Sequence, residues 1–112
     1  CINAWGPGHK LIDAAEAREL RRLFSGGLAA IPAVSIKGAV GNPLGAAPAM
    51  QVAAAVIAQQ CGLIPPTVNW QYPDPACRLR LSDQPLSVEH ASTLVNAHGI
   101  SGVNSSLIVS RC

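Results

Sequence analysis

The stretch Lys37-Gly38-Ala39-Val40-Gly41-Asn42-Pro43-Leu44-Gly45-Ala46-Ala47 joins an apolar segment to an alanine-rich one. Val34 and Ile36 alternate with polar residues over 31–37, which predicts a strand that ends at Lys37. The glycines allow a turn with close backbone approach, and a helix should follow it. Because ligand-contacting residues of open α/β sheets gather where strands end, we expect Lys37 at the mouth of a pocket. A lysine that ends a strand in solvent is the alternative.

The helix after this turn is predicted to begin in two steps. Asn42 and Pro43 suit the N-cap and first positions of a helix. Pro48 has no N–H to donate and would clash one turn back, so the first turn should be kinked or separate, with regular helix over 48–60. The glycine spacing matches neither the dinucleotide-binding nor the Walker pattern, so phosphate binding of that kind is not expected.

The chain is apolar for its size, since 49% of its 112 residues are hydrophobic and 12% are charged. No Asp, Glu, Lys or Arg occurs between Lys37 and Asp74, a gap that includes the whole predicted helix. A helix that is apolar on every face is normally buried between layers, so Ile57→Ala should cost about 2 to 5 kcal/mol of stability. A membrane span competes with this interpretation, but Pro48 and several glutamines argue against it. The glutamines are Gln51, Gln59 and Gln60.

Charge and cysteine content exclude several classes of function. A net charge of +2 is too small to indicate binding to nucleic acid or to an anionic membrane. The four cysteines form no CxxC pair and have no histidine at metal-ligand spacing, so neither a metal site nor a redox motif is expected. They are Cys1, Cys61, Cys77 and Cys112. We expect reduced thiols and a cytoplasmic location, since no targeting peptide is visible.

The first helix is predicted over 11–24. Asp13 and Glu16 have the spacing of a capping box, and Glu16 also falls on the apolar stripe of the helix. Two explanations for this acid remain open. It folds back as a cap, or it is a buried carboxylate that needs a cation, for which Lys37 is available.

The remaining segments complete an α/β pattern. Residues 1–4 resemble the end of a strand whose beginning is missing, which suggests a processed or partial chain. The prolines make 64–69 extended, 70–75 is a turn-rich connection, and 78–81 alternates like an exposed strand. Residues 82–90, with His90, are expected to form a surface loop. Two β-rich runs, 93–98 and 103–109, are joined by a glycine-rich connection and predict a hairpin.

Four ordered motifs in this sequence resemble the C-terminal part of the β-ketoacyl synthase (ketosynthase) family. Asn3-Ala4-Trp5-Gly6-Pro7-Gly8-His9 is similar to the family's Asn-Ala-His-Gly-Thr-x-Thr, and Lys37 to Ala47 is similar to its Lys-Ser-x-x-Gly-His-x-x-Gly-Ala-Ala. Residues 62–75 match its proline-rich run. Residues 96–104 match its closing Asn-Ser-Phe-Gly-Phe-Gly-Gly-x-Asn. The resemblance covers essentially the whole chain.

The resemblance implies a thiolase-like fold, in which two similar α/β halves pack in layers of helix and sheet and two subunits form a dimer. Residues 1–112 would then be one C-terminal ketosynthase-like domain, incomplete at its N-terminus. The family's nucleophilic cysteine belongs to the first half, and none of the four cysteines here has its context. The nucleophile, if there is one, lies on another segment or chain.

The resemblance also assigns a role to each candidate site residue. Trp5 and Asn42 replace the two histidines that donate hydrogen bonds to developing negative charge in active ketosynthases. Removing one such donor typically costs on the order of 100- to 1000-fold in rate, so losing both should be close to silencing. The supporting charged cluster of the family is retained. It consists of Lys37, Asp13 and Glu16.

The substrate-binding positions are altered as well. The family's two threonines that bind the pantetheine arm correspond to Pro7 and His9, and His9 is a loop histidine or, as an alternative, a relocated catalytic one. The phenylalanines of the acyl-pocket gate correspond to His98 and Ile100, on either side of Gly99, which changes the shape and depth of the pocket.

These replacements predict a pseudo-ketosynthase, similar to the chain-length factors that pair with an active ketosynthase in fatty acid or polyketide-type biosynthesis. The alternatives are an active, divergent acyltransferase whose cysteine lies outside this chain, and a structural fragment without an acyl ligand. No cofactor is expected, although a phosphopantetheine thioester on acyl carrier protein or coenzyme A is a possible ligand. The expected partners are the N-terminal ketosynthase half, a second subunit in a homodimer or heterodimer, and acyl carrier protein.

Overall fold

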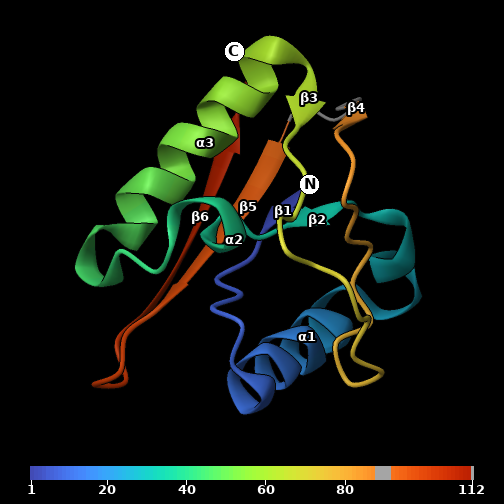
Figure 1. Ribbon diagram of the computed structural model, residues 1–112, viewed down its shortest axis with the longest axis vertical. Coiled ribbons are helices and arrows are strands. Elements are labelled where there is room, and N and C mark those ends of the chain that lie inside the picture. The colour runs from blue at the N-terminus through green and yellow to red at the C-terminus, as the bar shows by residue number, and fades with distance from the viewer. Residues whose placement is uncertain (88–91, 112) are drawn as a thin grey trace.

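The computed structural model describes residues 1–87 and 92–111. Its helices and strands alternate along the chain, as the sequence predicts for an α/β protein (Figure 1). The elements are β1 (Ile2–Asn3), α1 (Lys10–Phe24), the 3₁₀ helix η1 (Ser25–Ala30), β2 (Ala33–Val34), α2 (Lys37–Val40), the 3₁₀ helix η2 (Leu44–Ala46), α3 (Ala47–Cys61), β3 (Leu63–Ile64), β4 (Leu86–Ser87), β5 (Ser92–His98) and β6 (Asn104–Ser110).

The main sheet has the strand order β2-β1-β5-β6. Strand β1 pairs in parallel with both neighbours, so that Ile2 lies between Ala33 and Leu94. Strands β5 and β6 form the antiparallel hairpin that the sequence predicts, in a register that runs from Ser92↔Ser110 to His98↔Asn104. Residues 1–4 therefore contain a strand, as expected, and this short strand lies in the interior of the sheet between β2 and β5.

The two long helices cover opposite faces of the sheet. Ile2 points toward α1 and packs in a buried cluster with Leu20 and Leu28. The next side chain along the strand, Asn3, points the other way and donates to the Gln51 carbonyl oxygen of α3 at 3.1 Å. Figure 1 shows the two helices well apart, with the strands of the sheet between them.

The predicted strand over 31–37 is too long. Its ladder ends at Val34, because the Ser35 N–H donates to the Thr67 hydroxyl at 3.3 Å instead of to a neighbouring strand. Lys37 consequently begins α2 rather than ending a strand. The turn that follows needs Gly38, since a Cβ atom there would overlap the Val68 carbonyl oxygen.

Helix α3 begins close to the predicted place. The separate first turn is observed as η2, and Pro48 lies in the first turn of α3. The prediction that Asn42 and Pro43 cap this helix is wrong, because its N-cap is Ala46. The helix ends at Gly62, whose φ of 68° and ψ of 19° give the left-handed conformation that glycine adopts at helix ends.

Three further local predictions need correction. Helix α1 has no capping box, since its N-cap is His9 and no side chain caps it. The predicted exposed strand over 78–81 is reduced to a single bridge between Pro32 and Arg80. The predicted loop over 82–90 contains β4, which pairs with β3, and its last part, including His90, lies outside the described residues.

The outward face of α3 is apolar and exposed. The exposed fraction is 58% for Ile57, 38% for Val56 and 37% for Met50. The expectation that Ile57 is buried between layers is therefore wrong for these 112 residues, because the sheet covers only one side of the helix. Within 1–87 and 92–111, no helix has the length and apolarity needed to cross a membrane.

Substitutions of two isoleucines test which apolar side chains are buried in the core. Ile64 is 2% exposed and packs with Val34 and Cys1, so Ile64→Ala should lower the free energy of unfolding by about 2 to 5 kcal/mol. The matched change Ile57→Ala removes the same atoms from an exposed side chain and should cost below about 1 kcal/mol. Urea unfolding of the 112-residue chain measures both. Equal losses would contradict the placement of α3.

Candidate functional site

Three predicted site residues meet at one edge of the sheet. Strands β1, β2 and β5 run parallel, so their carboxyl ends lie together, and Trp5, Lys37 and His98 lie at or just after these ends. The ring centroids of Trp5 and His98 are 5.3 Å apart in an edge-to-face arrangement. The Lys37 Nζ lies 5.8 Å from the centroid of the Trp5 ring, within the range of a cation–π contact. We call Trp5, Glu16, Lys37 and His98 the Trp5 cluster.

Glu16 fixes the main-chain position of the cluster. It is 6% exposed, and its Oε1 and Oε2 accept hydrogen bonds from the backbone N–H groups of Trp5 at 2.9 Å and of Gly6 at 3.1 Å. The Asn96 side chain of β5 donates to Oε1 as well, at 3.2 Å. The carboxylate therefore caps the loop after β1 rather than its own helix, and it joins α1 to two strands.

Lys37 is buried at 7% exposure, but it does not form a close ion pair with Glu16. Its Nζ donates to the Trp5 carbonyl oxygen and, at 3.4 Å, to Gln51 Oε1. Burial lowers the pKa of this ammonium group, while the negative charges of Glu16 and Asp13 act in the opposite direction. Backbone amides therefore satisfy the buried Glu16 carboxylate, and Lys37 is a more distant counter-charge.

Gln51 belongs to the site, although in the sequence this glutamine indicated only that its helix does not span a membrane. Its side chain is fully buried, and Nε2 donates to the carbonyl oxygens of Ala4 at 2.9 Å and Asn96 at 3.0 Å. Its Oε1 faces Lys37. The signal in the sequence was a glutamine inside an otherwise apolar helix segment, since a buried amide needs specific partners.

His98 is held at the end of β5 by the strand that pairs with it. Its Nδ1 lies 2.7 Å from Asn104 Oδ1, and its Nε2 lies 4.0 Å from Glu16 Oε1. The Trp5 ring packs against the same imidazole, and no hydrogen bond reaches Nε2 among the described residues. The structure therefore places His98 in the Trp5 cluster, whereas His9 is exposed at the start of α1 and makes no such contact among the described residues.

The other predicted residues lie at the margins of the cluster. Asn42 is exposed in the loop after α2, and its Oδ1 accepts a hydrogen bond from the Leu44 N–H at 3.4 Å. Gly99 starts the tight turn of the hairpin, and the Ile100 side chain is 96% exposed at its tip. Pro7 is half-buried in the loop after β1.

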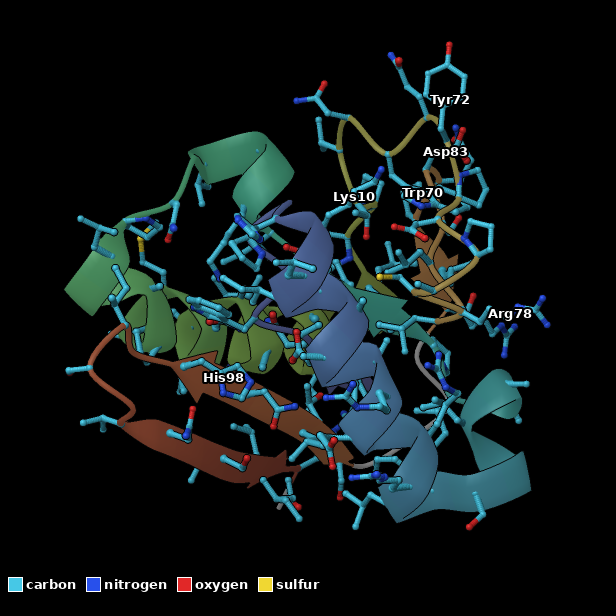
Figure 2. All side chains as sticks on the ribbon, turned by 90° about the horizontal axis from the view of Figure 1, so that it is seen from below. Lys10, Trp70, Tyr72, Arg78, Asp83 and His98 are labelled. Atoms are coloured by element: carbon cyan, nitrogen blue, oxygen red, sulfur yellow. The ribbon has the colours of Figure 1, made fainter. Side chains whose placement is uncertain are left out.

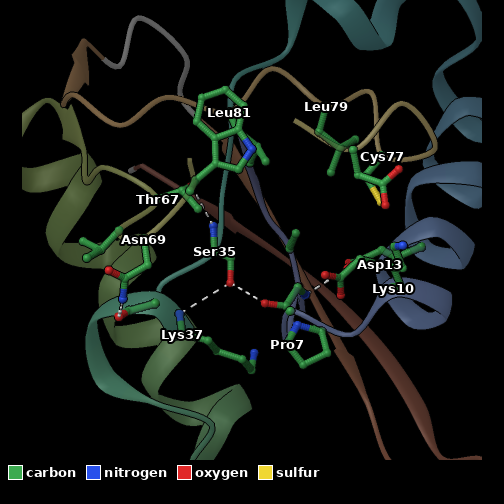
Figure 3. A pocket seen from close by; sticks show the side chains of 18 of the residues that line it. Pro7, Lys10, Asp13, Ser35, Lys37, Thr67, Asn69, Cys77, Leu79 and Leu81 are labelled. Carbon is green, nitrogen blue, oxygen red and sulfur yellow. Dashed lines mark hydrogen bonds between the residues drawn. The ribbon is translucent and has the colours of Figure 1, made fainter. Parts of the chain in front are cut away.

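A cavity of about 390 Å³ lies beside the loop after β1, between the start of α1 and the connection that follows β3, and Glu16 and Lys37 of the Trp5 cluster help to line it (Figure 3). Asp13 and Cys77 line it near α1, and Lys37 and Asn69 line it across the opening. Asp13 Oδ1 is buried without a hydrogen-bond partner among the described residues. Burial and then the Glu16 charge raise the pKa of Asp13, and burial also raises the pKa of the Cys77 thiol.

The charged groups do not form a metal site. Within the described residues, no group of three or more His, Cys, Asp or Glu side chains is placed to hold a metal ion. Cys1, Cys61 and Cys77 carry free thiols, and the buried Cys1 Sγ lies 3.3 Å from the Thr93 hydroxyl. None of these three cysteines lies in the Trp5 cluster.

Comparison with known proteins identifies the family. The model of the β-ketoacyl synthase C-terminal domain matches residues 1–71. This chain belongs to the β-ketoacyl synthase family. It is 36% identical to nodulation protein E of Rhizobium sp. (strain N33) over 107 residues, which is 95% of this chain and 27% of that protein. It is 32% identical to the tetracenomycin polyketide synthase ketoacyl synthase alpha subunit of Streptomyces glaucescens, over 98% of this chain and 26% of that protein.

Solved ketosynthase structures share the fold. The ishigamide ketosynthase/chain length factor superposes with a TM-score of 0.91 at 29% identity, covering 99% of this chain and 27% of that one. A ketosynthase in complex with a type II polyketide acyl carrier protein, AntDE:AntF, gives a TM-score of 0.94 at 28% identity, covering 99% and 28%. The fold is thiolase-like, as the sequence motifs predicted, and this chain spans about a quarter of the length of these relatives.

Glu16 tests the hydrogen bonds that hold the Trp5 cluster. In Glu16→Gln one acceptor oxygen becomes an amide group that faces a backbone N–H, so the free energy of unfolding should fall by about 2 kcal/mol or more. Chemical denaturation measures the loss. Glu19→Gln, an exposed change on the same helix, is the control and should leave the unfolding midpoint unchanged. A Glu16→Gln midpoint equal to wild type would contradict the proposed hydrogen bonds.

Asp13 gives a second test, which depends on pH. Because its pKa in the folded protein is raised above the ordinary 3.8, the folded protein keeps this proton to higher pH than the unfolded chain does. Wild type should therefore lose stability as pH rises through the raised pKa, a loss that Asp13→Asn removes. The stability of the variant relative to wild type should increase between pH 3.5 and 7 in denaturation experiments. A difference that is constant or falls over this window would contradict the raised pKa.

Proposed function

We propose that this ketosynthase-family chain is part of a pseudo-ketosynthase, a chain-length-factor-like subunit that shapes an acyl tunnel and a dimer interface. The observation that carries the proposal is the Trp5 ring, which stands in the cluster where the family has a histidine, packed edge-to-face on His98. The indole has one N–H and no basic nitrogen, so it cannot exchange a proton near neutral pH. Asn42, at the second histidine position, is exposed and bonded within its own loop.

In this proposal the charged side chains of Lys37 and Glu16 hold the main chain in place and take no part in a reaction. Lys37 donates to the Trp5 carbonyl oxygen, and Glu16 accepts from the Trp5 and Gly6 amides. Both charges thus hold the main chain of one loop. A loop held this firmly presents the Trp5 ring as a fixed wall, which is the requirement for setting the length of a tunnel.

The ligand and partners follow from the family. We propose a phosphopantetheine thioester as the ligand, delivered by acyl carrier protein, together with an N-terminal ketosynthase half and an active ketosynthase as the second subunit. A homodimer is the alternative to this heterodimer. Support comes from two structural neighbours, one a ketosynthase/chain length factor and the other a ketosynthase in complex with an acyl carrier protein.

An active, divergent β-ketoacyl synthase is the second candidate. The alpha subunit from the tetracenomycin system and the 3-oxoacyl-[acyl-carrier-protein] synthase 2 of Coxiella burnetii, which is 31% identical over 111 residues, favour it because both are named as synthases. In this case a cysteine outside the 112 residues would be the nucleophile. Lys37 and Asn42 would support the reaction.

Condensation by the full-length protein separates the two candidates. Incubated alone with acyl and malonyl thioesters of acyl carrier protein, the pseudo-ketosynthase should form no β-oxoacyl product above the uncatalysed rate, and adding an active ketosynthase partner should restore product formation. Mass spectrometry of the carrier-bound chain measures both. Ordinary turnover by the protein alone, abolished in Lys37→Ala and kept in the exposed-site control Arg18→Ala, would establish the enzyme instead. Native mass spectrometry that detects no complex with acylated carrier protein would leave only a structural role.

A further inference from the structure

The hydrogen-bonding state of the His98 ring is fixed by its neighbour on β6. The Asn104 Nδ2 donates to the Gly102 carbonyl oxygen at 3.2 Å, so the amide oxygen of Asn104 must face His98. That oxygen can only accept, and it lies 2.7 Å from Nδ1, so Nδ1 carries the hydrogen. The remaining ring nitrogen, Nε2, has no hydrogen-bond partner in the part of the chain that the structure describes.

The charged group nearest to Nε2, the Glu16 carboxylate, does not form a hydrogen bond with it. Glu16 Oε1 lies 4.0 Å from Nε2, beyond hydrogen-bond distance, and already accepts from the Trp5 N–H and the Asn96 amide. Lys37, the other charged member of the cluster, is engaged with the Trp5 carbonyl oxygen and Gln51. Neutral His98 presents Nε2 as an acceptor, and protonated His98 presents it as a donor. In both states this atom requires a polar partner.

His98 is also accessible from outside the chain. Its side chain is 32% exposed, while the Glu16 side chain beside it is 4% exposed. Figure 2 shows His98 at the end of β5, on the opposite side of α1 in this view from Trp70 and Tyr72. The ring is thus separate from the cavity lined by Asp13 and Cys77, and it belongs to the Trp5 side of the site.

We propose that His98 makes this site select acyl chains that carry a hydroxyl or oxo oxygen within reach of Nε2, such as 3-hydroxyacyl or 3-oxoacyl chains, over saturated chains of the same length. The inference rests on the proposed function, because it takes the acyl chain to lie against Trp5 and His98. A hydroxyl can donate to or accept from Nε2, and an oxo group can accept from its protonated form. A saturated chain would bury Nε2 without a partner, whereas Trp5 offers the same apolar surface to both.

The test compares three ligands of equal chain length on the full-length protein. These are 3-hydroxyoctanoyl-, 3-oxooctanoyl- and octanoyl-pantetheine, with binding measured by calorimetry. We expect at least one oxygenated chain to bind on the order of 10-fold more tightly than octanoyl, which is the usual effect of leaving one buried polar atom unpaired. His98→Phe should abolish this preference by weakening the oxygenated chain alone.

Two further variants separate direct contact from a structural effect. Asn104→Ala releases Nδ1 and should reduce the preference while octanoyl binding is kept. Ser110→Ala, which removes an exposed hydrogen bond with Ser92 at the opposite end of the same hairpin, is the matched control and should change neither affinity. The ¹⁵N resonance of His98 Nε2 should shift on adding the preferred chain and should not shift with octanoyl.

The outcomes distinguish a failure of the His98 selectivity from a failure of the proposed function. Equal binding of all three chains, unchanged in His98→Phe, would overturn the selectivity and leave the acyl tunnel in place. A preference that persists in His98→Phe, without a shift of the Nε2 resonance, would assign the selection to other residues and overturn the role of His98. Failure of any chain to bind would overturn the proposed function, and the inference would fail with it.

Discussion

The structure depends on burying one carboxylate, that of Glu16, where the ends of three parallel strands meet. A buried charge is costly unless its oxygens are satisfied, and here two backbone amides and the Asn96 side chain satisfy them. These bonds join α1 to the loop after β1 and to β5. Gln51 makes the corresponding links from α3 on the opposite face. The site is therefore built around main-chain groups, and side chains at its surface can be exchanged without dismantling it.

This dependence explains how the loop after β1 can hold different side chains at position 5. The contacts that place residue 5 involve its own N–H and carbonyl oxygen, which any amino acid supplies. Lys37 and Glu16 would be needed for the loop even if no reaction occurred there. Retention of charged groups is thus weak evidence for catalysis in this fold, and the proton-transferring side chains are the informative positions.

The sequence predicted the elements better than their contacts. The hairpin followed from two alternating runs around a glycine-rich turn, and the family motifs led to the correct fold. The stripe of α1 located Glu16 inside, but of the two explanations left open the cap is wrong, because its hydrogen-bond partners are loop amides brought in by the sheet rather than its own helix end. The strand over 31–37 was overextended for a similar reason: Thr67, distant in sequence, takes the Ser35 N–H. Gln51 was missed because its partners, the carbonyl oxygens of Ala4 and Asn96, come together only after folding.

Helix α3 is the element whose buried and exposed faces differ most from the sequence prediction. Its composition suggests burial on every side, yet its polar Gln51 and Gln59 face the sheet while the apolar Ile57 faces outward. Composition alone cannot assign these directions, because buried amides become favourable only where carbonyl and hydroxyl groups are placed to receive them. Gln59 finds Thr93 and the Val109 carbonyl, and Gln51 finds the ends of β1 and β5. The two glutamines therefore fix the position of α3 along the sheet through specific hydrogen bonds, while its apolar side chains lie on the opposite face. This position brings Gln51 Oε1 to the Lys37 ammonium group and so joins α3 to the Trp5 cluster.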